Sequence, residues 1–254
     1  MNLSLEKKVA EKAPQLLSLA KSAKNALASS NLTAHRAKVC LALDVSGSMS
    51  EMVEAGTVQR VCDRALALGL NFDDDGDIDV FLFGRSVKQM DSLSVDNIAG
   101  FVQRFWGGSD HKQADWTGTN YGPVIKAVTE NYFIPQKKSS GFLGLGGMKS
   151  LPVPKPMPAY VIFITDGENA DRAEAQAAII DASYGPVFWQ FIGIGKENFA
   201  FLRALDDMAG RYTDNANFFK VENIDSMDDE SLFRKMMAEY PGWIQKAKDG
   251  KLLT

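Results

Sequence analysis

One apolar segment ends abruptly in three evenly spaced oxygen-bearing side chains, and this ending constrains the chain more than any other feature. Residues 39–43 are hydrophobic, and Asp44, Ser46 and Ser48 follow them directly. In an extended chain alternate side chains point the same way, and the glycine between the two serines lets the backbone bend. One carboxylate and two hydroxyls suit a hard divalent cation, so the segment predicts a buried strand that presents oxygen ligands to magnesium or manganese.

Three protein oxygens do not complete an octahedral site, and two further candidates follow along the chain. Thr119 precedes a helical pattern, and Asp166 follows the apolar run 160–164. Open parallel sheets collect ligands outside the carboxyl ends of their strands, which predicts one shared crevice. The predicted metal ligands are Asp44, Ser46, Ser48, Thr119 and Asp166. The alternative is that these side chains only cap helix starts, as Ser, Thr and Asp often do.

Strand-like and helix-like segments alternate from residue 37 onward. The expected strands are Lys38–Leu43, Ile78–Phe83, Ser86–Asp91, Ala159–Ile164, Pro186–Ile194 and Asn217–Val221. This alternation predicts an α/β fold with a doubly wound, mostly parallel central sheet flanked by helices. We expect residues 1–36 to form a helical extension packed on a domain of residues 37–254, which closes with C-terminal helices.

A glycine- and proline-rich segment, residues 136–158, interrupts the alternation. It has neither helical nor strand periodicity, so we interpret it as a long loop inserted into the domain. Two roles stay open for it, a mobile connection or a flap that binds a partner. Its glycines lack the frame and the preceding strand of a phosphate-binding loop.

Composition limits the classes of function. The chain has 254 residues, of which 45% are hydrophobic, enough for one large α/β domain. A net charge of −4 argues against a nucleic-acid-binding surface. No apolar run reaches the ~20 residues of a membrane span, and the N-terminus does not resemble a signal peptide. We therefore predict a cytoplasmic protein in which Cys40 and Cys62 are reduced, buried thiols.

Two tryptophans, Trp106 and Trp116, lie in the loop that leads into Thr119. They are either aromatic anchors that face a partner or rings that pack beneath the loop. His111 lies between them, but the sequence holds one other histidine and no suitably spaced cysteine. A zinc site is therefore not predicted.

The densest acidic run contains Asp73, Asp75 and Asp77 at alternate positions. The run resembles the start of a calcium-binding loop, but it lacks the later bidentate acid. It lies between a helix and a strand, where Asp and Gly ordinarily form turns. A solvated turn is favoured over a weak second cation site, which would lie at the opposite end of the sheet.

The Asp-x-Ser-x-Ser motif, followed by Thr119 and Asp166, resembles the metal-ion-dependent adhesion site of von Willebrand factor type A domains. Other segments resemble the bacterial tellurium-resistance proteins of this type, the TerF-like group, over nearly the whole chain. These segments are 41–49, 58–60, 73–76, 79–84, 118–121, 191–195 and 240–244. The resemblance implies direct ligation by Ser46, Ser48 and Thr119, with Asp44 and Asp166 acting partly through waters. Magnesium or manganese is expected in preference to calcium.

Three classes of function compete. The resemblance implies a metal-dependent protein-interaction module in tellurite resistance or stress response, whose partner supplies an Asp or Glu carboxylate to the metal. Other tellurium-resistance proteins are candidate partners. A magnesium-dependent phosphate-handling enzyme is the first alternative, but no convincing nucleophile or general base accompanies the cluster. A scaffold with a purely structural metal is the second, and such a site would favour more carboxylates. We expect an interaction module that is not an enzyme.

Overall fold

A single six-stranded sheet organises the chain. The computed structural model describes residues 3–73, 76–133 and 155–254. Within them the strands are β1 (Lys38–Asp44), β2 (Asp79–Phe83), β3 (Val87–Gln89), β4 (Ala159–Thr165), β5 (Val187–Ile194) and β6 (Ala216–Val221). The spatial order is β3-β2-β1-β4-β5-β6. Every pairing is parallel except that of β3 with β2, which is antiparallel. The predicted doubly wound, mostly parallel sheet is confirmed.

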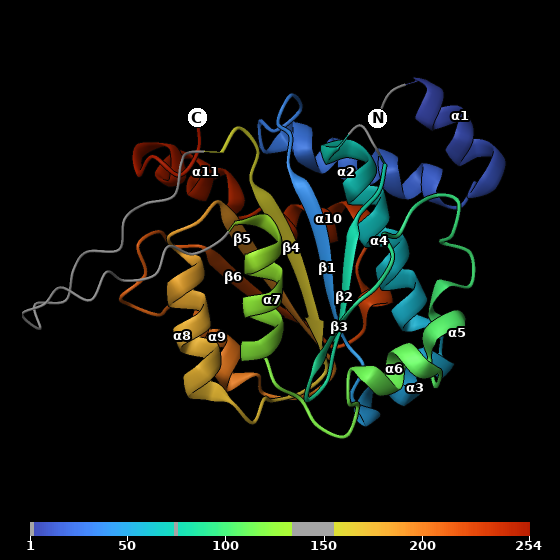
Figure 1. The fold of residues 1–254 in the computed structure, drawn as a ribbon. Coiled ribbons are helices and arrows are strands. Elements are labelled where there is room, and N and C mark those ends of the chain that lie inside the picture. The colour runs from blue at the N-terminus through green and yellow to red at the C-terminus, as the bar shows by residue number, and fades with distance from the viewer. Residues whose placement is uncertain (1–2, 74–75, 134–154) are drawn as a thin grey trace, which may run out of the picture.

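Helices cover both faces of this sheet. The longer ones are α1 (Leu3–Lys12), α2 (Leu16–Ser29), α4 (Thr57–Phe72), α7 (Gly122–Tyr132), α8 (Arg172–Ala182), α10 (Asp229–Met236) and α11 (Tyr240–Asp249). The shorter ones are α3 (Ser50–Glu54), α5 (Phe101–Phe105), α6 (Ser109–Gln113), α9 (Ala200–Asp206), and the 3-10 turns Gly47–Met49 and Ile224–Ser226. Figure 1 shows α7 and α8 in front of the sheet and α10 behind it.

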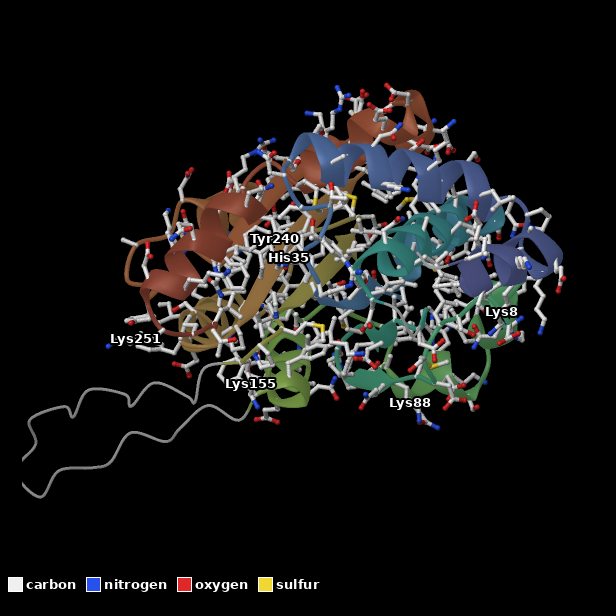
Figure 2. The ribbon with its side chains drawn as sticks, turned by 90° about the horizontal axis from the view of Figure 1, so that it is seen from above. Lys8, His35, Lys88, Lys155, Tyr240 and Lys251 are labelled. Carbon is white, nitrogen blue, oxygen red and sulfur yellow. The ribbon has the colours of Figure 1, made fainter. Side chains whose placement is uncertain are left out.

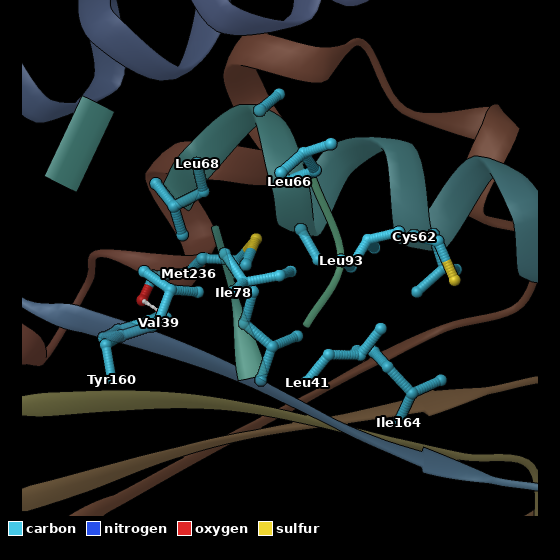
Figure 3. Packing of buried hydrophobic residues seen from close by; sticks show 14 of the residues in the cluster. Val39, Leu41, Cys62, Leu66, Leu68, Ile78, Leu93, Tyr160, Ile164 and Met236 are labelled. Carbon is cyan, nitrogen blue, oxygen red and sulfur yellow. Dashed lines mark hydrogen bonds between the residues drawn. The ribbon is translucent and has the colours of Figure 1, made fainter. Parts of the chain in front are cut away.

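The alternation of side chains along each strand divides the core into two clusters. Leu41 of β1 joins the layer that contains α2, α4 and α10, whereas Ala42 joins the layer of α7, α8 and α9. Figure 3 shows Leu66 and Leu68 of α4 above the strands in the first layer. Both faces of the central strands are therefore buried, as their continuous apolar runs predict.

The two cysteines lie in different layers. Cys40 belongs to the cluster of α7 and α8, and Cys62 belongs to the cluster of α4. Both are free and buried. The sheet separates them, and burial raises the pKa of each thiol.

The N-terminal and C-terminal helices meet in the layer that covers one face of the sheet. His35, which follows α2, lies 2.9 Å from the Tyr240 hydroxyl through its Nε2 atom, and Figure 2 shows the two side chains together. Asn25 of α2 also donates a hydrogen bond to Glu230 of α10. No helix in the described ranges is both long and apolar enough to cross a bilayer.

The chain reverses its direction of travel across the sheet at one point. It moves outward from β1 to β2 and β3, then returns through α7 to β4 on the other side of β1. The carboxyl ends of β1 and β4 therefore flank a topological switch point, which is where open α/β sheets form ligand sites.

Candidate metal centre

Asp44 is the last residue of β1, and its carboxylate is fixed by two donors. The backbone N–H of Ser46 donates to Oδ1 at 2.8 Å, and the Thr165 hydroxyl donates to Oδ2 at 2.6 Å. Asp44 is only 1% exposed. The bond from Thr165 ties the end of β4 to the end of β1, and the bond from Ser46 holds the same carboxylate against the turn that follows β1.

Ser46, Ser48 and Asp166 form a continuous chain of oxygens. The hydroxyls of Ser46 and Ser48 lie 3.1 Å apart, and the Ser48 hydroxyl donates to Asp166 Oδ1 at 2.8 Å. Ser46 is extended, and a 3-10 turn begins at the next residue, Gly47. This turn bends the chain so that the hydroxyls of Ser46 and Ser48, on either side of Gly47, lie next to each other.

Thr119 reaches the same place from a distant part of the chain. Together with Ser46, Ser48 and Trp116 it lines an open pocket at the carboxyl edge of the sheet. Two backbone hydrogen bonds hold its loop: Gly47 N–H donates to the Trp116 carbonyl at 3.1 Å, and Ala170 N–H donates to the Thr119 carbonyl at 3.0 Å. The structure thus brings all five predicted ligand residues together.

The two carboxylates carry charge that no neighbouring cation offsets. Burial raises the pKa of Asp44 to about 6, and the nearby Asp166 carboxylate raises it further. Burial likewise raises the pKa of Asp166, and Glu197 adds to this shift. No basic side chain in the described part of the chain lowers the pKa of either carboxyl. The cluster is therefore a locally acidic site that a divalent cation would stabilise.

The chemistry of the donors fits a hard cation. All five side chains offer oxygen, and three of the residues, Ser46, Ser48 and Thr119, offer neutral hydroxyls. Oxygen ligands without nitrogen or sulfur suit magnesium and manganese. Nowhere in the described residues, this cluster included, do three His, Cys, Asp or Glu side chains come close enough to share a metal ion, so a cation here would depend on the hydroxyls.

Three residues that the sequence did not single out support the cluster. Thr165 is fully buried and bonds Asp44 directly. The Tyr121 hydroxyl lies 3.2 Å from Thr165 Oγ1 and donates to the Gly167 carbonyl at 2.6 Å. Asp171 accepts hydrogen bonds from the N–H groups of Tyr121 and Gly122, which caps the start of α7. Of these three residues, only Thr165 could have been noticed in the sequence, because it is a polar residue at the end of an apolar strand.

The two candidate anchor tryptophans have different environments. Trp116 is 43% exposed and lines the pocket. Trp106 is half-buried and stacks on the His111 ring, with ring centroids 4.2 Å apart. His111 itself is buried, and both of its ring nitrogens contact backbone atoms. Trp116 is therefore the tryptophan that is available to a partner.

The acidic run lies at the other end of the sheet, between α4 and β2. Asp73 forms an ion pair with Lys38, with 2.5 Å between Oδ2 and Nζ. Asp77 is exposed, and Asp75 lies outside the described residues. The weak second cation site stays a prediction. Most of the inserted loop 136–158 also lies outside the described residues.

Comparisons with known proteins agree with this architecture. The chain is 35% identical over 231 residues to the uncharacterized protein YcbR of Bacillus subtilis (strain 168), covering 90% of this chain and 86% of that protein. It is also similar to two crystal structures of proximal thread matrix protein 1 from the mussel byssus, with TM-scores of 0.54 and 0.53 and 18% identity. Each match covers 80% of this chain but only 47% of that protein, so the chain spans about half of its length. At this identity the likeness concerns the fold alone.

The fold and the oxygen cluster at its switch point define an α/β protein of the von Willebrand factor A class. Residues 36–143 and 148–253 match the family described as vWA-TerF-like, the von Willebrand A domain found in the TerF C terminus. The chain therefore belongs to the vWA-TerF-like family, and the resemblance seen in the sequence is confirmed.

Proposed function

We propose that this chain is a divalent-cation-dependent protein-interaction module and not an enzyme. The observation that carries the proposal is an open pocket lined by Ser46, Ser48 and Thr119. The carboxylates of Asp44 and Asp166 lie next to this pocket, because they accept hydrogen bonds from the Ser46 N–H and the Ser48 hydroxyl. Ser46, Ser48 and Thr119 would ligate magnesium or manganese directly, while Asp44 and Asp166 would act partly through waters. Membership of the family of von Willebrand A domains supports an interaction role.

The partner would supply an Asp or Glu carboxylate. Because the direct ligands are neutral hydroxyls, a bound cation would keep much of its positive charge and one coordination position for that carboxylate. The pocket is open to solvent and flanked by the half-exposed Trp116, so a side chain can reach it. Attraction between a carboxylate and a cation is strong in a partly dry pocket, which makes partner binding depend on the metal.

The biological setting that the family suggests is tellurite resistance or a related stress response in the cytoplasm. The support is the family description, which names TerF. Other tellurium-resistance proteins are then the first partners to test. Metal-dependent capture of such a protein by this chain, lost on addition of a chelator, would support this assignment.

Calorimetric titration of the unmodified chain with MgCl₂ and MnCl₂ tests the proposal. Saturable binding of either ion is expected. Absence of binding for both ions, together with equal partner affinity with and without a chelator, would overturn it.

Metal affinity should fall as the pH is lowered through about 6. The cation binds the ionised carboxylates, and burial raises the pKa of Asp44 to about 6, so protons compete with the metal below that pH. One such group weakens apparent magnesium binding by about tenfold between about pH 7.5 and about pH 5, and Asp166 adds to the effect. Titrations at several pH values measure this. An affinity that stays constant over this range would contradict the assignment of Asp44 to the site.

Thr165→Val should weaken magnesium binding without unfolding the chain. The substitution removes the hydroxyl that donates to Asp44 Oδ2 at 2.6 Å, so the ionised carboxylate loses a buried hydrogen bond. We expect roughly three- to tenfold lower affinity at neutral pH, the usual worth of one such bond. Thr129→Val is the matched control, since that buried hydroxyl on α7 has no hydrogen-bond partner among the described residues. Equal losses in the two variants would contradict a positioning role for Thr165.

A further inference from the structure

Trp116 forms one wall of the candidate metal pocket. A Cβ atom built at Gly47 would lie 3.4 Å from the six-membered ring of Trp116, so the indole rests directly against the glycine between Ser46 and Ser48. The Trp116 carbonyl also accepts a hydrogen bond from Gly47 N–H at 3.1 Å. A residue that places its carboxylate on a cation at these serines would therefore have its neighbour in sequence, about 3.8 Å further along, beside the indole.

The indole is held in place from behind. The ring centroids of Trp116 and His111 are 5.7 Å apart, and those of His111 and Trp106 are 4.2 Å apart. Gly107 N–H donates to His111 Nδ1 at 2.8 Å, so the ring proton lies on Nε2, which donates to the Val45 carbonyl at 2.8 Å. A stack fixed by two backbone hydrogen bonds leaves Trp116 little freedom to lose on binding, which favours affinity.

The charge beside the indole limits what can bind there. The Arg85 guanidinium lies against Gly118, where an added Cβ would be 3.5 Å from Nε. Its side chain is 63% exposed, and its contact with Asp115 is loose, with 3.9 Å between Nε and Oδ2. Asp115, which directly precedes Trp116, is 39% exposed and offsets this positive charge. The two opposite charges give a lysine or arginine of a partner no net attraction at Trp116. An aromatic ring needs no such attraction and gains from contact with the half-exposed indole.

Resting on the proposed function, we propose that Trp116, at the edge of the metal pocket, selects partners in which the metal-binding Asp or Glu is next in sequence to an aromatic residue. The carboxylate takes the open position on the cation, and the aromatic ring packs on Trp116. Trp116 would then determine which acidic segments of a partner bind, while the metal ion would be required for any acidic segment to bind.

Capped dipeptides test this selection in the presence of saturating MgCl₂. The probes are acetyl-Asp-Phe-amide, acetyl-Phe-Asp-amide, acetyl-Asp-Gly-amide and acetyl-Asp-Lys-amide, followed by nuclear magnetic resonance titration of the full chain. We expect at least one Phe peptide to bind about tenfold more tightly than the Gly peptide, as burial of part of a benzyl group against the indole would give. The Lys peptide should bind no better than the Gly peptide.

The variant Trp116→Ala should remove the preference for Phe, so that it binds the Phe and Gly peptides with equal affinity at saturating MgCl₂. Tyr212→Ala is the matched control, since Tyr212 is 41% exposed and does not line the metal pocket. Equal affinity of the unmodified chain for the Phe and Gly peptides, or tighter binding of the Lys peptide, would overturn the inference and leave the proposed function standing. Absence of magnesium-dependent binding by every Asp peptide would instead overturn the proposed function, and this inference with it.

Discussion

Ser46→Ala and Asp44→Ala are expected to abolish saturable magnesium binding and to leave the fold intact. The Ser46 hydroxyl lies 3.1 Å from that of Ser48 and lines the pocket, so its removal takes away a direct ligand. Asp44 contributes one of two carboxylates at the site, and alanine there removes half of the negative charge that attracts the cation. Water can take the vacated position on the ion, so each variant exchanges a protein ligand for solvent. Because magnesium gives up its waters reluctantly and the site has few charged ligands, we expect the remaining affinity to be too low for calorimetry to detect.

The stability of Asp44→Ala should change much less than its metal binding. Burial raises the pKa of Asp44, which means that its ionised form costs free energy in the folded chain at neutral pH. Asp44→Ala loses two hydrogen bonds, about 1 kcal/mol each, and gains from removal of the buried charge. The two effects oppose each other, so we expect its melting temperature to stay close to that of the unmodified chain. Residues retained at an energetic cost are typical of functional sites.

Thermal denaturation and calorimetry on the same samples separate the two effects. Ser226→Ala is the matched control, because that hydroxyl donates only to the Asn223 carbonyl and lies outside the pocket. The control should bind magnesium like the unmodified chain. If Ser46→Ala bound magnesium with unchanged affinity in a folded chain, the ion would have to be held elsewhere, and the proposed site would be wrong.

The meeting of the five candidate ligand residues could be predicted from sequence because of how parallel sheets are built. Asp44 and Asp166 each follow an apolar strand, and parallel strands bring their carboxyl ends to one edge. The alternation of Asp44, Ser46 and Ser48 then sets which side chains face the pocket. These inferences need only local pattern and one general rule of topology, and both are visible in a single sequence.

The supporting contacts could not be predicted, because they join segments far apart in the chain. Neither the contact of Trp116 with Gly47 nor the hydrogen bond from Thr165 to Asp44 has a local signature. The short helix α6 was also missed, since its five residues are too few to show a helical period. The helix α5 is equally short and begins at Phe101, after Gly100 with its positive φ of 62°.

Gly84→Ala is expected to lower both the stability of the chain and its affinity for magnesium. A Cβ atom at residue 84 would lie 2.6 Å from the Asp115 carbonyl oxygen and 2.8 Å from that of Ala114. These are backbone atoms, so no side chain can turn away to make room. The loop must move, and we expect a loss of about 2 kcal/mol in the free energy of unfolding, typical of overpacking at a tight contact.

The same substitution should weaken magnesium binding by at least about tenfold, although residue 84 touches no ligand, because small displacements of positioning loops have effects of this order. The crowded loop continues into Trp116, whose carbonyl holds Gly47, and Asn120 N–H donates to the Gly84 carbonyl at 2.8 Å. Moving this loop therefore shifts Thr119 relative to the two serines.

Gly242→Ala provides the control that separates crowding from the general effect of replacing glycine. Nothing lies within 4 Å of a Cβ at Gly242, which is within α11, so alanine there should stabilise the chain by about 0.5–1 kcal/mol and leave metal affinity unchanged. Denaturant unfolding and magnesium titration of both variants measure the contrast. Native stability and native affinity in Gly84→Ala would mean that the loop relaxes freely. The close approach at Gly84 would then not determine the position of Thr119. The cation itself would have to bring Thr119 to the two serines.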